Sequence, residues 1–297
     1  MKSLEKKKAV WGFIFVLPAI LFFIIFNFYP MGYAFWFSFF KKNLISLRPP
    51  KFVGFQNYIY LFQSESFWNS VKATGIFALG TFVPIVIFSL LFAVLISSRK
   101  RFQKFLQLAY YSPAVLSSVV AATIWFLMFQ PYGLANQFLN FIFNTNNIDY
   151  KWLSSEKMLI LATIIVYFWK YVGYYTIIFI AGIASIPKSV HEAAIIDGAN
   201  KWQDFWYITL PLLKPTTLLV SVMSMIQTLR TFSTQYFFVQ SGAPIKPIEV
   251  ITLNIYNTAI RDMRIGRASA MSIILLFVIM FFTFIQFKIS KSDEISY

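Results

Sequence analysis

Lys170 is a cation in the middle of a long apolar segment, and three tyrosines accompany it at helical spacing. Residues at i, i+3, i+4 and i+7 share one face of an α-helix, so this stripe has four members: Tyr167, Lys170, Tyr171 and Tyr174. Tyrosine rings stack on sugar rings, while hydroxyl and ammonium groups bond sugar hydroxyls. We predict that the stripe lines a path for a hydroxylated solute. The alternative is that these groups hold neighbouring helices together.

Two further stripes carry polar groups at similar spacing. The second consists of Gln227, Arg230, Thr231 and Thr234, and for it cavity lining and interhelical packing both stay open. The third consists of Ser118, Ala121, Ala122 and Trp125. Its small side chains favour helix packing. Ser118 is the member of this stripe that we expect to contact the transported solute, the cargo.

A charge at the centre of a membrane helix costs about 2.5–3.5 kcal/mol. Lys170 and Arg230 lie in apolar segments that contain no acidic residue. We therefore expect both cations to face protein or a watery cavity. They suggest an anionic cargo, such as a uronic-acid or sialic-acid glycan or glycerol phosphate. The alternative is a neutral sugar, with the cations hydrated inside the cavity.

The elements that position these residues are long apolar segments. The chain has 297 residues, of which 58% are hydrophobic and only 12% charged, which is typical of a polytopic membrane protein. We predict an all-α protein with six membrane-spanning helices and a proline, Pro84, that interrupts the second. The expected spans are 9–28, 71–96, 105–129, 158–185, 212–239 and 266–287.

The charge distribution indicates the membrane and an orientation within it. The formal net charge is +15, and most basic residues flank the apolar segments. This placement indicates anionic lipid and not nucleic acid as the partner. Basic clusters at residues 6–8 and 99–104 mark cytoplasmic segments under the positive-inside rule. We expect a multi-pass protein of the bacterial inner membrane with both termini in the cytoplasm.

Several kinds of chemistry lack their residues in this sequence. The chain has no cysteine and one histidine, His191, for which an ordinary surface position is the simplest interpretation. We find no metal-ligand cluster, no paired catalytic carboxylates and no phosphate-binding GxxxxGK[ST] motif. We therefore predict a protein that is not an enzyme and holds no cofactor. If ATP drives it, another chain must bind the nucleotide.

A polar segment, residues 186–215, separates the fourth and fifth apolar segments. Residues 189–197 suit a short helix, and Gly198 permits a sharp turn. Residues 201–207 suit a second helix, which Pro211 and Pro215 would end. We predict a compact two-helix projection outside the membrane.

This segment contains Glu192-Ala193-Ala194, then Gly198 and, nine residues further on, Ile208-Thr209-Leu210-Pro211. The spacing resembles the EAA coupling motif of permease subunits in type I, binding-protein-dependent ABC importers. Residues 52–58 and 266–270 are similar to the FVGxxNY and GxASA segments of carbohydrate-type permeases. Residues 111–122 match a further family segment only in part, because Ser112 and Ser117 replace its Leu and second Pro.

The resemblance implies the type I importer permease fold in a single domain, 1–297, with 186–215 as the coupling loop. It implies that the loop docks on a cytoplasmic ATPase and transmits the force of ATP-driven closure. The docking residues would be Glu192, Ala193, Ala194 and Gly198, and we add the acidic Asp197 beside them.

The implied partners are a second, non-identical permease, two ATP-binding subunits that use ATP and Mg²⁺, and an extracytoplasmic solute-binding protein. The implied cargo is a carbohydrate, and this chain is similar to the first of the two permeases. Related permeases for peptides or amino acids share the coupling motif and remain an alternative. An ion-coupled secondary transporter would keep acidic residues in its membrane helices, and this chain has none there.

Overall fold

The computed structural model describes residues 2–46, 48–99, 101–145 and 148–291, with backbone alone for residues 2–10 and 291. Two compact units form, residues 1–65 with 254–276 and residues 66–253 with 277–297. Two helices belong to both units. Helix α14 (Ile251–Tyr256) begins in the second unit and ends in the first, and α15 (Ile265–Lys291) begins in the first and ends in the second. The basic side chains at positions 6–8 and 100, and the C-terminus, lie outside the described residues.

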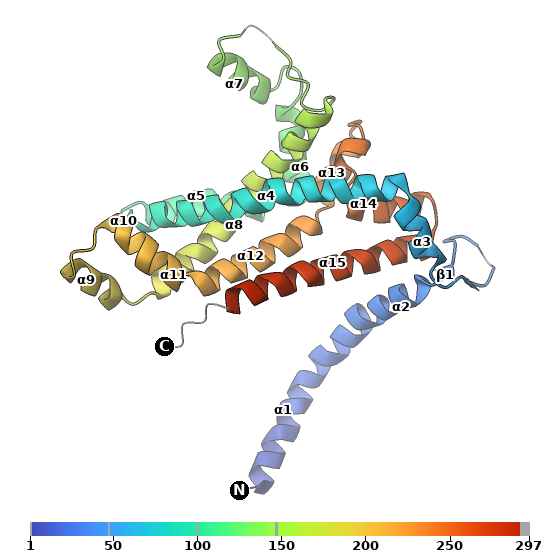
Figure 1. The fold of residues 1–297 in the computed structure, drawn as a ribbon, viewed down its shortest axis with the longest axis horizontal. Coiled ribbons are helices and arrows are strands. Elements are labelled where there is room, and N and C mark those ends of the chain that lie inside the picture. The colour runs from blue at the N-terminus through green and yellow to red at the C-terminus, as the bar shows by residue number, and fades with distance from the viewer. Residues whose placement is uncertain (1, 47, 100, 146–147, 292–297) are drawn as a thin grey trace. The chain divides into compact units, whose positions relative to one another are not determined.

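The first unit begins with an almost continuous apolar helix that ends at a small sheet (Figure 1). Pro30 lies in the second position of α2, directly after the π-helical turn of η1. In the sheet, Phe40 pairs with Phe52 and Lys41 with Lys51 in antiparallel register. The elements are α1 (Lys2–Phe23), the π-helix η1 (Ile24–Phe28), α2 (Tyr29–Phe37), β1 (Phe40–Lys41), β2 (Lys51–Phe52), α3 (Gln56–Gln63) and the π-helix η4 (Asn257–Arg261), followed by the start of α15.

A buried asparagine fixes the sheet to α3. Asn57 Nδ2 donates to the carbonyl oxygens of Ser38 (2.8 Å) and Phe40 (3.0 Å). Gly266, in the first turn of α15, lies so close to Phe40 that an added Cβ would overlap its carbonyl oxygen. Because burial of these polar groups is compensated by hydrogen bonds, the end of α2, the sheet and the start of α15 form one rigid frame.

The second unit is built around α8 (Glu156–Ser185), a helix of 30 residues with no proline. At 1.5 Å per residue it is about 45 Å long, enough to cross a bilayer and extend beyond it. The other elements are α4 (Glu65–Ser97), α5 (Gln103–Val115), α6 (Ser118–Met128), α7 (Leu134–Ile142), α9 (Lys188–Ile196), α10 (Lys201–Asp204), the π-helix η2 (Phe205–Thr209), α11 (Leu210–Leu212), α12 (Lys214–Leu229), α13 (Ser233–Gln240) and the 3₁₀ helix η3 (Lys246–Ile248).

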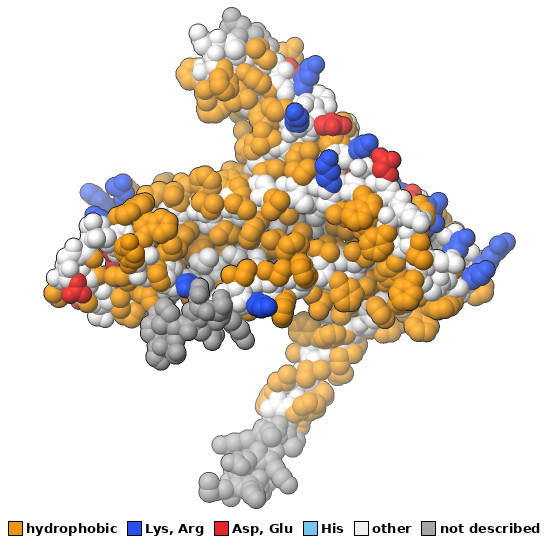
Figure 2. All heavy atoms as spheres, viewed as in Figure 1, with side chains coloured by type: hydrophobic (Ala, Val, Ile, Leu, Met, Phe, Trp, Pro, Cys, Tyr) orange, Lys and Arg blue, Asp and Glu red, His pale blue; other side chains and the backbone are white. Residues whose placement is uncertain are grey.

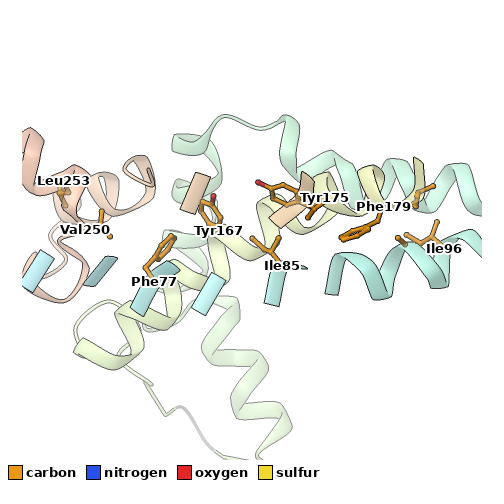
Figure 3. Close-up of a cluster of buried hydrophobic side chains, with 11 residues drawn as sticks. Phe77, Ile85, Ile96, Tyr167, Tyr175, Phe179, Val250 and Leu253 are labelled. Carbon is orange, nitrogen blue, oxygen red and sulfur yellow. The ribbon is translucent and has the colours of Figure 1, made fainter. Parts of the chain in front are cut away.

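The core of the second unit follows α8 (Figure 3). From α4, Phe77 packs edge-on against Tyr167 with ring centroids 5.3 Å apart. Further along, Ile85 of α4 and Tyr175 and Phe179 of α8 belong to the same cluster of fully buried side chains. Close helix approach at Gly173 brings α5 against α8, since an added Cβ there would overlap the carbonyl oxygen of Tyr110.

Two of the expected spans are bent. The prediction of one helix over 105–129 is wrong in detail, because α5 and α6 meet at 96°. The bend lies at Leu116, whose backbone is extended, and Ser117 caps α6 by accepting from the amide of Val120 at 3.2 Å. The second bend, of 65°, lies at Leu213 between residues 201–212 and 214–240.

The remaining spans are unbroken, and their limits lie within a few residues of prediction except at two places: the first span continues to Phe37, and the second begins at Glu65. They cover Trp11–Phe37, Glu65–Ser97, Glu156–Ser185 and Ile265–Ser290. With each bent pair counted as one crossing, the described chain has six candidate spans, as predicted. The expected interruption at Pro84 is wrong, since α4 continues through it. Hydrophobic side chains cover most of the visible surface (Figure 2), as a lipid-facing protein requires.

Candidate functional site

The continuous α8 places the predicted stripe on one face. The rings of Tyr167 and Tyr171 lie 4.5 Å apart, and the Lys170 ammonium lies 5.1 Å from the centroid of the Tyr171 ring. One turn further, Tyr174 stacks with Tyr111 of α5 at 6.5 Å. The stripe is therefore a contiguous row of aromatic faces around one cation, and part of it also packs against α5.

Lys170 is buried, with 6% of its surface exposed. Its Nζ donates to the hydroxyl of Ser118 at 2.8 Å. The bend between α5 and α6 makes Ser118 the first residue of α6, which brings its hydroxyl to α8. This contact joins two of the three predicted stripes. The spacing within each helix gave no signal for it, because the two residues are 52 positions apart.

The helix dipole adds to the charge at this contact. The N-terminus of a helix carries about half a positive charge, and it favours an anion. Lys170 instead brings an ammonium group to the first residue of α6. A neutral hydroxyl bonds the ammonium there but does not neutralise it. The arrangement is positive overall and suits a negatively charged group.

Two tyrosine hydroxyls on α8 are buried without a partner among the described residues. They belong to Tyr167, on the stripe, and to Tyr175, whose ring is 1% exposed. The amide nitrogen of Gln235 in α13 is buried in the same way, although its oxygen accepts from Thr231 at 3.1 Å. A buried polar group without a bond costs about 1–3 kcal/mol, so these groups are available to bond a polar ligand.

The second predicted stripe does not form a single face. Its helix ends at Leu229, and Arg230 to Phe232 leave helical geometry before α13 begins at Ser233. Gln227 and Arg230 are exposed, whereas Thr231 and Thr234 are buried. The expectation of one continuous stripe is therefore corrected. The i, i+3, i+4, i+7 rule holds only while the backbone stays helical.

The third stripe packs as its small residues suggest. Ala121 and Ala122 are fully buried, and Trp125 lies 5.7 Å from Trp169 of α8. Only Ser118 of this set contacts a charged group.

The polar segment between α8 and α12 forms a braced two-helix loop. α9 ends at Ile196, with Asp197 as its C-cap, and Gly198 takes the left-handed conformation (φ 82°) that its sequence predicts. Asn200 then caps α10, accepting from the amides of Trp202 (3.0 Å) and Gln203 (2.9 Å). The backbone amide of Asn200 in turn donates to Oε1 of Gln203 at 2.9 Å, which completes a capping box.

His191 holds the two helices together. Its Nδ1 lies 2.8 Å from Oδ1 of Asp204, across 13 positions of sequence. The other carboxylate oxygen accepts from the hydroxyl of Thr209 at 3.4 Å. The sequence interpretation of His191 as an ordinary surface residue missed this brace. These side-chain bonds tie α9 to the segment that follows Gly198.

The predicted coupling residues divide into two groups. Glu192, Ala193, Asp197 and Gly198 are exposed, and Ala194 is buried inside the loop, where its small side chain lets α9 pack. Sequence reasoning overlooked the apolar residues of the same loop. Its exposed large side chains are Ile195, Ile196, Trp202, Trp206 and Tyr207. Exposed apolar patches of this kind are typical of surfaces that contact a protein or a membrane.

Metal ligands do not gather in the described part of the chain. Among its residues there is no group of three or more His, Cys, Asp or Glu side chains that could hold a metal ion. The groups available at the α8 stripe are hydroxyls, an ammonium and aromatic faces. They offer no arrangement of nucleophile and base.

Known proteins match this chain along nearly its whole length. A probable starch degradation products transport system permease protein, AmyD of Thermoanaerobacterium thermosulfurigenes, is 30% identical over 293 residues, which cover 97% of both chains. An sn-glycerol-3-phosphate transport system permease protein, UgpA of Agrobacterium fabrum, is 30% identical over 288 residues, again 97% of both.

A solved structure shares the fold with a TM-score of 0.82 at 25% identity, covering 99% of this chain and 100% of its own. It belongs to a bacterial ABC transporter involved in the import of the acidic polysaccharide alginate. Residues 85–292 match the family described as the inner membrane component of binding-protein-dependent transport systems. With relatives aligned from end to end and more than half of its residues inside the family match, the chain belongs to the permeases of this family.

Proposed function

We propose that this permease carries an oligosaccharide, delivered by an extracytoplasmic solute-binding protein, across the bacterial inner membrane by alternating access. ATP and Mg²⁺ would be bound and ATP hydrolysed by two partner subunits, and the loop formed by residues 186–215 would couple them to the membrane helices. The observation that carries this proposal is the braced, partly apolar loop between α8 and α12.

The loop has the properties of a mechanical contact. Ile196 is 85% exposed and Trp202 70%, although both side chains are apolar. Ile196 lies outside the candidate spans, and Trp202 lies in the short arm before the bend at Leu213. A partner groove that covers them would bury a central apolar patch, and Glu192 and Asp197 at its edge would pair with basic groups. Because His191 and Asp204 join α9 to α10, displacement of the loop would move α8 and α12 together.

The cargo path would follow the α8 stripe. Tyr167, Tyr171 and Tyr174 supply ring faces and hydroxyls for a sugar, and Lys170 supplies a fixed charge. Thr231 and Thr234 would add hydroxyls from the neighbouring segment, while the exposed Gln227 and Arg230 would face water within the path.

We propose that the cargo is an acidic oligosaccharide. Lys170 and the N-terminus of α6 together form a buried positive site, and no acidic residue lies within the predicted spans to neutralise it. The solved relative in alginate import and the glycerol-phosphate permease relative are both described with anionic solutes. The AmyD relative, described with starch degradation products, represents the neutral alternative.

The assembly and orientation complete the proposal. The chain would act as one permease domain beside a second, non-identical permease, so that cargo passes between them. Its N-terminus, C-terminus and loop 186–215 would share the cytoplasmic side, because the chain has six candidate crossings and four of them precede the loop. α7, at the other end of α8, would then lie on the side of the solute-binding protein (Figure 1).

The coupling proposal is tested by reversing one exposed charge on the loop. Glu192→Arg should lower both uptake of a labelled uronate trisaccharide and cargo-stimulated ATP hydrolysis by at least about tenfold, because a like charge at an interface costs several kcal/mol. Glu156→Arg is the matched control, since Glu156 is also exposed but lies in the first turn at the opposite end of α8. Its uptake should change less than about threefold.

Gly198→Pro extends the test to the shape of the loop. Proline cannot adopt the φ of 82° found at Gly198, so α9 and α10 would lose their mutual angle. Co-purification of the ATPase subunits with each variant shows whether docking itself is lost. Wild-type uptake and ATP hydrolysis in Glu192→Arg and Gly198→Pro alike would refute the coupling assignment.

A further inference from the structure

The first unit contains a cavity of about 500 Å³ that the transport proposal does not use. It lies between the segment after α2 and the start of α15, and all its lining residues belong to this one unit. Four of them are cations: Lys41, Lys42, Arg264 and Arg267. No Asp or Glu is among the described residues that line it. The cavity is therefore a concentrated positive site.

The cations are held by the backbone and do not sit on loose loops. Lys41 lies in β1, and an isolated β-bridge joins Asn43 to Arg264. The amide of Leu44 donates to the carbonyl oxygen of Met263 at 2.8 Å, which closes the same junction. Two segments far apart in sequence thus hold their basic residues at one place. Fixed cations lose less entropy on binding an anion than flexible ones do.

One guanidinium is already oriented. The Arg267 guanidinium lies 3.4 Å from the centroid of the Tyr60 ring, in a cation–π contact. The ring covers one face of the planar group and leaves its edge N–H donors for an acceptor. A planar fork of donors matches phosphate or carboxylate oxygens. The buried Asn57 forms part of the same wall.

The position of the cavity beside the ends of two candidate spans indicates a lipid ligand. The first span ends at Phe37 and the last begins at Ile265, so every cation lies within about one helical turn of a span end. Aromatic side chains that surround the site in sequence are exposed: Trp36, Phe52, Phe55 and Phe62. Exposed aromatic residues next to cations are typical of the headgroup level of a bilayer. A soluble anion would gain nothing from such apolar neighbours.

We propose that this cavity binds the phosphate of an anionic phospholipid headgroup, with the acyl chains along the exposed aromatic surface of α2 and α3. The ligand would occupy a fixed site at the membrane surface, distinct in residues from the cargo stripe and the coupling loop. The inference depends neither on the identity of the cargo nor on the coupling assignment.

The test uses the complete transporter, purified in detergent and titrated with fluorescent phosphatidylglycerol or phosphatidylcholine. Lys41→Gln with Arg264→Gln removes two charges from the cavity and should weaken phosphatidylglycerol binding by about tenfold or more. The control pair is Arg48→Gln with Lys51→Gln. Lys51 is the register partner of Lys41 in the sheet, yet neither control residue lines the cavity. This pair should change binding by less than about twofold.

Competition separates a lipid from a soluble anion. Neither inorganic phosphate nor a uronate trisaccharide should displace the fluorescent lipid, because neither contributes acyl contacts. Displacement by one of them at about 10 mM, an ordinary concentration for weak anion binding, would assign the site to that soluble anion and overturn the proposal. Equal losses in the cavity pair and the control pair would also overturn it, since general surface charge would then explain the binding.

Two further measurements guard against a folding defect. Arg264→Lys keeps the charge and should retain phosphatidylglycerol binding within about threefold. In the wild-type transporter, raising salt from about 50 to about 500 mM should weaken binding of phosphatidylglycerol more than that of phosphatidylcholine. An equal salt response of the two lipids would contradict an electrostatic headgroup site without any variant.

Discussion

Lys170 and Arg230 have the same sequence signature and different structural positions. Each is a cation in an apolar segment, with polar neighbours at i+1 and i+4 on the same expected helix face. Lys170 is 6% exposed and bonded to Ser118, whereas Arg230 is exposed at the end of α12. The difference arises from the backbone. α8 stays helical through Lys170, and α12 stops at Leu229.

Breaks in helices therefore decide what the spacing means. The bend between α5 and α6 carries Ser118 to Lys170 and gives the buried ammonium a partner. The break after Leu229 separates Arg230 from Thr234 and leaves the Arg230 side chain exposed. A charge that is hydrated costs little and contributes little, whereas a buried one is expensive and specific. We infer that selection of cargo charge rests on α8.

The largest effect on the buried Lys170 site is expected when α8 is displaced from α5. In Gly173→Ala the added methyl group would overlap the Tyr110 carbonyl oxygen, so the helices must move apart. Overpacking of this kind costs about 1–3 kcal/mol. The thermal midpoint of the purified complex should fall, and uptake should drop by at least about tenfold as Lys170 loses its alignment with Ser118.

Gly75→Ala is the matched control for this prediction. Gly75 lies inside α4, and nothing lies within 4 Å of the position of its missing Cβ. Alanine favours a helix over glycine by about 1 kcal/mol, so this variant should be as stable as the wild type or more so. A normal midpoint and normal uptake in Gly173→Ala would show that α5 and α8 are not in close contact there.

The second prediction compares the two cations directly. Lys170→Met should lower uptake of a uronate trisaccharide by about tenfold, because a hydrogen bond to a charged group contributes about 1.5–3 kcal/mol. Arg230→Met should lower it by no more than about threefold, since the guanidinium is exposed. Removing a buried charge also removes its desolvation cost, so the thermal midpoint of Lys170→Met should not fall.

Neutral and acidic oligosaccharides make the comparison more specific. In wild-type membranes the uronate trisaccharide should compete with labelled cargo better than maltotriose does, and the advantage should disappear in Lys170→Met. If only neutral sugars compete, the acidic-cargo proposal fails. An equal loss in both methionine variants would instead show that exposure does not separate the roles of Lys170 and Arg230.

The sequence predicted the spans because their signal is long and local. Apolar segments of this length are typical of bilayer spans. Both limits of α8 and α15 and the C-terminal limit of α4 lie within a few residues of prediction, whereas α4 begins earlier than predicted. The bend at Leu116 and the passage of α4 through Pro84 were not predicted. Both depend on neighbouring helices, which compensate lost backbone hydrogen bonds in ways a single segment does not encode.

The candidate site shows the same division. The turn at Gly198 and the starts of the two loop helices follow from turn and capping chemistry within a few residues. The predicted end of the second helix before Pro211 is wrong, because helical geometry continues through Pro211 to Leu212. The bond between His191 and Asp204 and the one between Lys170 and Ser118 join residues far apart in sequence. Either would have required the packing of whole helices to be known. The exposed apolar residues of the loop could have been identified in the sequence, but the prediction considered mainly its charged and small residues.

The smallest expected effect concerns the hydroxyl that bonds Lys170. Ser118→Ala removes one acceptor and leaves the ammonium in place, so uptake of the uronate trisaccharide should fall by about threefold. In a double-mutant cycle, adding Ser118→Ala to Lys170→Met should cause no further loss, because the bond is already absent. Ser117→Ala is the neighbouring control, since it removes the cap of α6 and not the contact with Lys170. Additive losses from Ser118→Ala and Lys170→Met would mean that the two side chains act separately on cargo, and the buried site would then consist of an ammonium alone.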